Sequence, residues 1–269
     1  MKKILALLIA LTLVFTLAAC GGGGGDSADN ASGISSPADL EAEGTRIGVQ
    51  LGSTGHSFAE ENFPDAEILA YDSNSDVILA LLSGDVDAVI MDDSPAQSFV
   101  AQNADRLAQL NELLTEEYYG IAFQLGSPYT AMFNEALDTL RADGTLDSLI
   151  DYWVNENTET AGRYVSPEGT THPNGTLLMG TSADWPPFEF IEAGVIVGLD
   201  PDIARAIGDL LGYEIEIVDM TFDTIILSVQ TGQVDFGMAG MTVNEERLEH
   251  VDFTQGYFLS GQSIIVRIS

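Results

Sequence analysis

The sequence predicts an α/β protein made of two similar lobes, and three observations support this fold class. From about residue 46 onward, short apolar runs typical of β-strands alternate with runs of helical spacing, as in parallel-rich sheets. Residues 71–92 and 218–240 repeat one layout of strand, Asp-initiated helix, Gly and Val-Asp strand. In both repeats polar residues follow the strand ends, where open α/β sheets bind small ligands.

The expected elements follow from the hydrophobic periodicity of each segment. The first lobe is expected over residues 46–115, with strands near 47–50, 68–71 and 86–91 and helices ending near 63, 82 and 102. The second lobe is expected over residues 116–269, with helices over 132–142, 146–154, 202–211 and 222–230 and strands over 214–218 and 234–238. Residues 155–175 are polar, contain scattered Gly and Pro, and are expected to form a linker inside the second lobe.

The N-terminus has the pattern of a secretion signal. Lys2 and Lys3 precede an apolar run that ends in Leu-Ala-Ala-Cys, and this run is too short to favour a permanent membrane span. The ending resembles the bacterial lipobox, which implies a signal peptide over residues 1–19 and a lipid on the sulfur of Cys20. Residues 20–45 are expected to be a flexible tether because Gly and Ser dominate their first half. The chain is therefore expected outside the cytoplasm, held to the membrane by its lipid anchor only.

Composition excludes several classes of partner. The chain has 42 acidic and 9 basic residues, a formal net charge of −33, so its surface repels nucleic acid and anionic lipid headgroups. The three histidines, His56, His172 and His250, lie in unrelated contexts without metal-ligand spacing. No metal, no cofactor and no nucleic-acid partner is expected.

The segment 234–247 carries the first half of a candidate binding site. Its apolar start reads as a strand, the chain breaks at Gly240, and Thr242 and Arg247 follow. An Arg beside exposed backbone amides suits a carboxylate, because its planar fork donates two parallel hydrogen bonds. The alternative is a surface ion pair between Arg247 and Glu245 or Glu246, which would contribute little.

The internal repeat places a second charged residue opposite the first. Asp87 and Asp235 correspond in the two repeats, and five residues later stand Asp92 and Gly240. Two lobes facing each other across their strand ends would therefore form a cleft with Arg247 on one wall and Asp92 on the other. This charge pair suits an α-amino acid, with Arg247 for its carboxylate and Asp92 for its ammonium. The alternative role for Asp92 is to cap the helix that follows it.

Several segments together resemble the family 3 solute-binding proteins of bacterial amino-acid ABC transporters. They cover nearly all of residues 46–269 apart from the linker, and they read GTSADWPPFEF, FDTIILSVQTGQVDFGMAGMTVNEER, VDFTQGYF, IGVQLGSTG, VDAVIMDD and EYYGIAF. The resemblance implies a two-lobed clamshell of the type II periplasmic-binding-protein kind. In that family the SADWPPFEF-type strand lies near the mature N-terminus, whereas here it follows the helices that normally end the chain.

The chain is therefore similar to a circular permutant of this family. Residues 46–115 would be the usual second lobe, and the linker 155–175 would join the old termini. A tandem fusion that lost its outer halves is the competing explanation. The permutation predicts a single covalent crossing between the lobes near residues 116–123, with the former second crossing left as a C-terminal strand beside the start of the first lobe.

The resemblance implies a role for each candidate site residue. Arg247 would bind the α-carboxylate, helped by backbone amides near Thr242 and Thr54, and Ser53 and Thr54 begin a helix whose free N–H groups favour an anion. The α-ammonium would meet Asp92, the Gly240 carbonyl and the Thr242 hydroxyl.

The remaining residues would contact the ligand's side chain. Trp185 and Phe222 would enclose the aliphatic or planar part of the ligand's side chain. Four residues would contact the end of that side chain and determine specificity: Gln50, Met91, Ser182 and Glu117. Trp185 could alternatively be a packed loop aromatic. Basic-amino-acid binders of this family often carry an acid at the position of Ser182, although Asp93, Asp184 and Glu117 could compensate here. A polar L-amino acid is the expected ligand.

The expected function is that of a monomeric receptor that captures an amino acid and delivers it to the permease subunits of an ABC transporter. The first rival is a dehydratase of the cyclohexadienyl or arogenate type on the same fold, which would need a general acid or base in the cleft. The second rival is the ligand-sensing module of a signalling receptor. The chain is expected not to be an enzyme.

Overall fold

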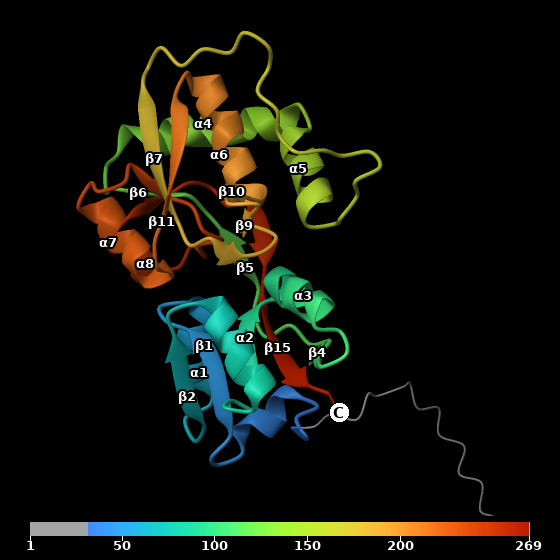
Figure 1. Ribbon diagram of the computed structural model, residues 1–269. Helices are drawn as coiled ribbons and strands as arrows, with labels where there is room; N and C mark the ends of the chain where they lie inside the picture. Colours follow the sequence, from blue (N-terminus) through green and yellow to red (C-terminus); the bar gives the residue numbers. More distant parts are fainter. Residues whose placement is uncertain (1–31, 269) are drawn as a thin grey trace, which may run out of the picture.

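The computed structural model describes residues 32–268, which form two α/β lobes stacked along the long axis of the molecule (Figure 1). The expected signal peptide, Cys20 and the first part of the expected tether lie outside the described residues. Within residues 32–268 no helix combines the length and the apolar character that a membrane span needs.

The first lobe is a five-stranded sheet in the order β2-β1-β3-β15-β4. β1 lies between β2 and β3 and is parallel to both, while β15 is antiparallel to β3 and β4. The helices pack on both faces of this sheet. The elements of this lobe are η1 (Pro37–Glu41), β1 (Arg46–Gln50), α1 (Thr54–Asn62), β2 (Glu67–Tyr71), α2 (Asn74–Ser83), β3 (Ala88–Asp92), α3 (Asp93–Gln102), β4 (Leu107–Gln109) and β15 (Gln262–Arg267).

The second lobe has a five-stranded sheet in the order β11-β7-β12-β6-β13 and a small sheet in the order β10-β9-β8. Its helices begin with α4 (Pro128–Ala142) and α5 (Thr145–Trp153). Its other elements are β6 (Ala122–Phe123), β7 (Thr176–Thr181), β8 (Asp184–Trp185), β9 (Glu189–Glu192), β10 (Val195–Val197), α6 (Leu199–Leu211), β11 (Glu214–Asp219), η2 (Phe222–Thr224), α7 (Ile225–Gln230), β12 (Phe236–Gly237), α8 (Glu245–Leu248) and β13 (Asp252–Phe253).

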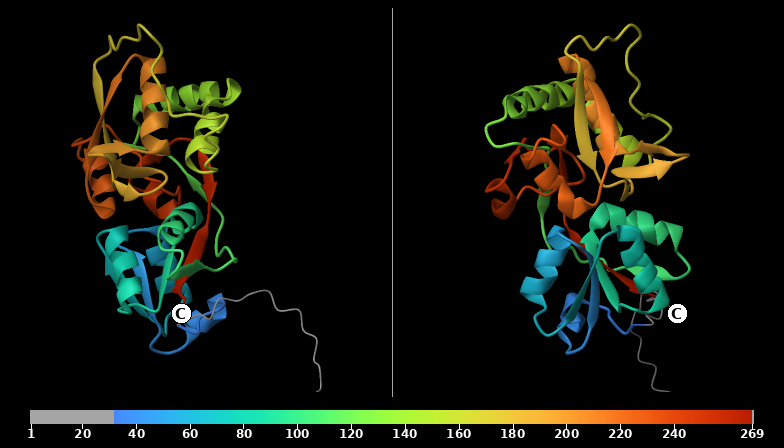
Figure 2. Two further views of the ribbon diagram at one scale, coloured as in Figure 1. Left: turned by 45° about the vertical axis from the view of Figure 1, so that its right-hand side comes forward. Right: turned by 60° about the vertical axis from the view of Figure 1, so that its left-hand side comes forward.

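The predicted α/β class and the internal repeat are confirmed by the strand pairing. In the first lobe β1 is the parallel neighbour of β2 and β3, and in the second lobe β7 is the parallel neighbour of β11 and β12. Because these strands are parallel, their carboxyl ends lie at one edge of each sheet. The two edges face each other between the lobes in both views of Figure 2.

The prediction of a single crossing between the lobes is wrong. β5 (Glu117–Tyr119) carries the chain from the first lobe to the second, and β14 (Phe258–Ser260) carries it back, the two strands pairing antiparallel between the lobes. β14 runs on into β15, which lies between β3 and β4 in the first sheet and not beside β1. The apolar run Ile264, Ile265 and Val266 is buried on both faces of that sheet, which explains why the chain must return.

Two of the expected boundaries are corrected as a consequence. The second lobe does not extend to residue 269, because β15 belongs to the first sheet. The tether does not extend to residue 45 either, because Ile34 and Leu40 are buried against the first lobe together with Ile47 and Val49 of β1. Burial of these two side chains explains why residues 37–41 are ordered as a short helix despite their polar surroundings.

Candidate functional site

The guanidinium of Arg247 lies at the contact between the lobes. Arg247 is only 7% exposed, and α8 carries it past the end of β12. Its Nη1 donates to the Thr242 carbonyl at 2.8 Å, and its Nη2 donates to the Gly52 carbonyl of the first lobe at 3.1 Å. The guanidinium carbon lies 5.4 Å from the centre of the Phe222 ring. These hydrogen bonds direct Arg247 into the interlobe space and away from its acidic neighbours on α8.

Asp92 approaches the same space from the first lobe. It is the last residue of β3 and the residue before α3, and it is 5% exposed. Its side chain makes no capping hydrogen bond to α3, so the alternative role as a helix cap is not supported. Gln262 of β15, directly opposite Asp92 in the sheet, donates from Nε2 to Asp92 Oδ1 at 2.9 Å.

The charges of the two residues influence each other. Burial raises the pKa of Asp92 to about 8, the nearby Glu117 carboxylate adds to this, and the Arg247 guanidinium opposes it. Burial lowers the pKa of Arg247, and the carboxylates of Asp92 and Glu117 oppose that shift. A pKa of about 8 keeps Asp92 mostly protonated at pH 7, and a cation placed beside it would favour its ionised form.

A polar network joins Asp92 to the threonines of both lobes. Gln262 Nε2 also donates to Thr54 Oγ1 at 3.1 Å, and Thr54 Oγ1 donates to Glu117 Oε2 at 2.8 Å. Thr242 of the second lobe donates to the same Glu117 oxygen at 2.6 Å. Glu117 therefore lies at the threonine end of the site, between Thr54 and Thr242. Sequence reasoning missed Gln262, whose position opposite Asp92 becomes apparent only when β15 is placed in the first sheet.

Ser53 and Gln50 support the start of α1. Ser53 is the N-cap of α1: its Oγ accepts from the backbone N–H of His56 at 3.0 Å and donates to the Gln50 carbonyl at 2.8 Å. The Gln50 side chain is buried, and its Nε2 has no hydrogen-bond partner among the described residues. A free amide donor at this place can serve a polar ligand, because a buried donor without a partner is costly.

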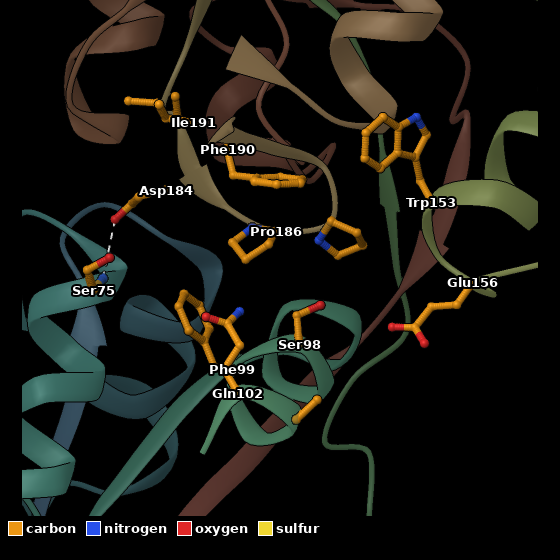
Figure 3. Close-up of a pocket in the computed structure, with 13 residues that line it drawn as sticks. Ser75, Ser98, Phe99, Gln102, Trp153, Glu156, Asp184, Pro186, Phe190 and Ile191 are labelled. Carbon is orange, nitrogen blue, oxygen red and sulfur yellow. Dashed lines mark hydrogen bonds between the residues drawn. The ribbon is translucent and has the colours of Figure 1, made fainter. Parts of the chain in front are cut away.

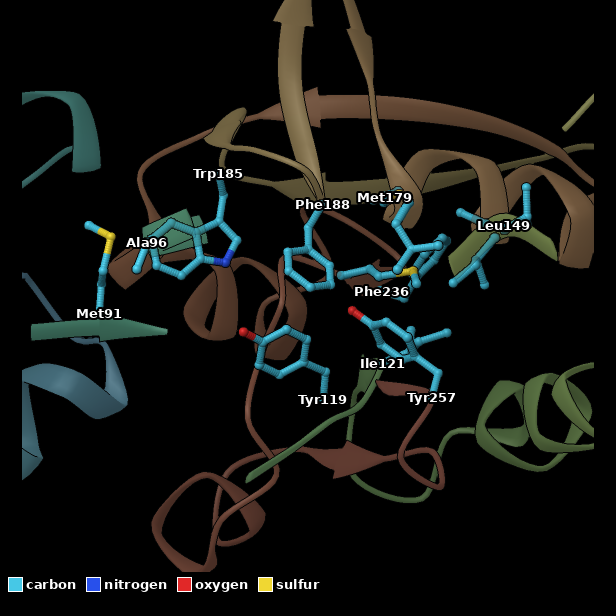
Figure 4. Close-up of a cluster of buried hydrophobic side chains, with 14 of the residues drawn as sticks. Met91, Ala96, Tyr119, Ile121, Leu149, Met179, Trp185, Phe188, Phe236 and Tyr257 are labelled. Carbon is cyan, nitrogen blue, oxygen red and sulfur yellow. The ribbon is translucent and has the colours of Figure 1, made fainter. Parts of the chain in front are cut away.

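Trp185 lies where the two lobes meet. In Figure 4 its indole lies between Met91 of the first lobe and Phe188 of the second, and all three side chains belong to one buried cluster. Gly240 has φ of 52°, and a Cβ there would lie 2.8 Å from Trp185 Nε1. A side chain at position 240 would thus displace the indole, which explains the glycine.

The backbone of Gly240 is fixed by a buried acid that sequence reasoning also missed. Gly240 N donates to Asp200 Oδ2 at 2.9 Å, and the hydroxyl of Tyr257 lies 2.8 Å from both carboxylate oxygens of Asp200. Burial raises the pKa of Asp200 to about 6, while these hydrogen bonds oppose the shift. With its N–H held by Asp200, the orientation of the Gly240 peptide is fixed within the second lobe.

Asp184 and Asp93, two acids considered as partners for a basic ligand side chain, form hydrogen bonds with other protein groups. Asp184 of the second lobe accepts the backbone N–H groups of Asn74, at 2.6 Å, and Ser75, at 3.3 Å, at the start of α2 in the first lobe (Figure 3). Asp93 accepts from the side-chain amides of Gln97 and Gln109, on its own lobe. Asp184 therefore clamps the lobes together, and Ser182 lies 3.5 Å from it through its Oγ.

A cavity of about 700 Å³ lies beside this clamp, between α3 and the β8–β9 segment (Figure 3). Aromatic and proline side chains form much of its wall, including Phe99, Trp153 and Phe190, with Asp184 at one side. None of the predicted ligand-binding residues lines it. The structure thus brings Arg247, Thr242, Thr54, Glu117 and Asp92 together at the contact between the lobes, and none of them lines this open cavity.

Comparison with known proteins identifies the stretch that carries Arg247 and Thr242. Residues 177–269 match the model of bacterial extracellular solute-binding proteins, family 3. We call residues 177–269 the family 3 stretch. The family 3 stretch contains Trp185, Gly240, Thr242 and Arg247, and the resemblance drawn from the sequence motifs is confirmed for it.

Known relatives of the family 3 stretch are amino-acid-binding proteins. The arginine-binding extracellular protein ArtP of Bacillus subtilis is 41% identical over 100 residues, 37% of this chain and 39% of that protein. A probable histidine-binding protein of Campylobacter jejuni is 32% identical over 105 residues, 39% of this chain and 40% of that protein. A glutamine-binding protein of Geobacillus stearothermophilus is 37% identical over 98 residues, 35% of this chain and 37% of that protein.

The chain spans no more than 40% of the length of these three relatives. Among solved structures, an ancestral arginine-binding protein bound to arginine is 48% identical over 31% of this chain and 38% of that chain, with a TM-score of 0.31. The relatives are named as binding proteins, several of them of ABC transporters, and not as enzymes.

Proposed function

We propose that this protein binds a polar L-α-amino acid between its lobes and delivers it to the permease of an ABC transporter. The observation that carries the proposal is that Arg247 and Asp92, on opposite lobes, are both buried and close enough for their charges to influence each other. Arg247 would bind the α-carboxylate, and Asp92, the Gly240 carbonyl and the Thr242 hydroxyl would receive the α-ammonium. Binding favours the closed form because only there do both walls contact the ligand.

The names of the relatives direct the choice of ligand to arginine, histidine and glutamine. Trp185, Phe222, Met91, Gln50 and Ser182 would surround the ligand's side chain. Because Asp93 and Asp184 are engaged in other hydrogen bonds, a guanidinium would find few free carboxylates here. A side chain with a polar but uncharged end, such as that of glutamine, is therefore an equal candidate to arginine.

Isothermal calorimetry of the purified chain against the twenty amino acids tests the proposal. We expect saturable one-to-one binding of one or a few polar L-amino acids and no binding of their D-enantiomers. Turnover of prephenate or arogenate, or the absence of binding by any amino acid, would contradict the proposed function.

We further propose that the chain acts as an extracytoplasmic monomer anchored by a lipid on Cys20. The signal-like N-terminus and its lipobox-like ending support this proposal, as do relatives described as extracellular. Mass spectrometry of the chain expressed in a bacterium should find Cys20 as the acylated N-terminal residue. An unmodified chain recovered in the soluble fraction would contradict the anchor.

We also propose that the order of the segments is a circular permutation, with its cut after β15 inside the first lobe, so that both crossings between the lobes are kept. The family 3 stretch ends in β15, inside a sheet whose other strands come from residues 46–109, and residues 155–175 connect α5 to β7 without helix or strand. A rearranged chain that places residues 176–268 before residues 46–154 should fold and bind the same amino acid. Failure of that chain to fold would favour the tandem-fusion explanation.

A further inference from the structure

The hydrogen bonds around Glu117 have a fixed direction. Three threonine hydroxyls surround its carboxylate: Thr54 and Thr242 lie 2.8 and 2.6 Å from Oε2, and Thr115 lies 2.6 Å from Oε1. A carboxylate only accepts, and a hydroxyl has a single proton to donate. The protons of all three hydroxyls therefore point at Glu117.

Thr54 and Thr242, the two threonines nearest the proposed ligand, differ in the lone pairs that they can still offer as hydrogen-bond acceptors. The Thr54 oxygen also accepts from Gln262 Nε2 at 3.1 Å, so one of its lone pairs is already used. Thr242 Oγ1 has given its proton to Glu117, and its further contact, with Thr54 Oγ1, is 3.5 Å long. Toward the interlobe space the Thr242 hydroxyl can therefore act only as an acceptor, which suits an N–H donor and not a carboxylate oxygen.

Gln262 fixes the donor–acceptor direction of the hydrogen bonds from Thr54 and Thr115 to Glu117. Its Nε2 donates to both Asp92 and Thr54, and its backbone N–H donates to Thr115 Oγ1 at 2.8 Å. Because Thr54 and Thr115 each accept from Gln262, both are left to donate to Glu117. Gln262 is fully buried, so water does not compete for these bonds.

We propose that Glu117 is a positioning residue that sets the polarity of the site by taking the proton of the Thr242 hydroxyl, so that Thr242 presents only lone pairs to the ligand's ammonium. The inference rests on the proposed function and gives Glu117 a different role from the expected one, in which it reads the ligand's side chain. Without Glu117 the hydroxyl rotates freely and can donate to a carboxylate instead, and the site loses its preference for an amino group.

The test compares three variants by calorimetry. Glu117→Leu removes the acceptor, Glu117→Gln keeps one acceptor oxygen, and Glu116→Leu is the matched control, because Glu116 is the exposed acidic neighbour in the same segment. Each is titrated with L-arginine, L-histidine and L-glutamine and with their des-amino analogues guanidinovaleric, imidazolepropionic and glutaramic acid. Thermal unfolding of each free variant confirms that it is folded.

We expect Glu117→Leu to bind the preferred amino acid about tenfold or more weakly, because the Thr242 hydroxyl is no longer held as an acceptor and its hydrogen bond to the charged ammonium is weakened. Its affinity for the des-amino analogue should fall much less, so that the ratio of the two affinities drops. Glu117→Gln should recover most of this ratio, and Glu116→Leu should keep it.

Two results would overturn the inference alone: unchanged amino-acid affinity in Glu117→Leu, or equal losses for the amino acid and its des-amino analogue. Failure of the wild-type chain to bind any of the three amino acids would instead overturn the proposed function, and this inference with it.

Discussion

Replacing Asp92 with Asn is expected to stabilise the empty protein at neutral and alkaline pH while weakening ligand binding about tenfold to a hundredfold. Burial raises the pKa of Asp92 from 3.8 to about 8. The unfolded chain therefore releases this proton first, and the folded state loses stability as the pH rises from about 4 to about 8. Asn does not titrate and can still accept the hydrogen bond from Gln262.

Urea unfolding of both proteins without ligand measures this effect. The free energy of unfolding of the Asn variant should exceed that of the wild type by about 2 kcal/mol or more at pH 8, and the difference should shrink toward pH 4. Binding weakens because the ammonium loses its ionic partner. Equal stability of the two proteins at pH 8 would show that burial does not raise the pKa of Asp92. Full ligand affinity in the Asn variant would show that Asp92 is not the partner of the ammonium.

Replacing Arg247 with Ala is expected to reduce the affinity for the amino acid more than a hundredfold. The variant loses a two-pronged charge-assisted contact with the α-carboxylate, and it leaves the Glu117 carboxylate without its nearby cation. Arg247→Lys keeps the charge but not the planar fork, and it should recover only part of the affinity. Calorimetry measures all three proteins.

A control separates this effect from the general loss of an arginine. Arg163, in the same lobe, lies over Trp153 and pairs with Glu192 at 3.1 Å, and neither contact belongs to the proposed ligand site. Arg163→Ala should keep the wild-type affinity. A loss in Arg163→Ala as large as that in Arg247→Ala would indicate that the second lobe as a whole, and not the guanidinium at position 247, supports binding.

The elements that sequence predicted well are those defined by local periodicity. The repeat in residues 71–92 and 218–240 is confirmed by the parallel pairing of both sheets, and it predicted that Asp92 and Arg247 follow strand ends on opposite lobes. The residue types at these strand ends led to the proposal of a zwitterionic ligand, because a buried cation on one lobe and a buried acid on the other can bind opposite charges of one molecule.

The features that sequence missed depend on pairing between distant segments. The returning strand β15 reads as an ordinary apolar run, and nothing local shows that it inserts between β3 and β4. Gln262 and Asp200 acquire their roles only through partners 170 and 40 residues away, Asp92 and Gly240. Ile34 and Leu40 were hidden in a polar stretch, where two apolar side chains are too few to produce a periodic signal.

The most direct test of the central claim varies the ligand and the protein together. Wild type, Arg247→Ala and Asp92→Asn are titrated with the preferred amino acid, its α-amide and its des-amino acid, and the affinities form two thermodynamic cycles. If the guanidinium holds the carboxylate and Asp92 holds the ammonium, the α-amide penalty should disappear in Arg247→Ala and the des-amino penalty should disappear in Asp92→Asn. Penalties of the same size in the wild type and both variants would show that the amino acid does not lie between these two residues.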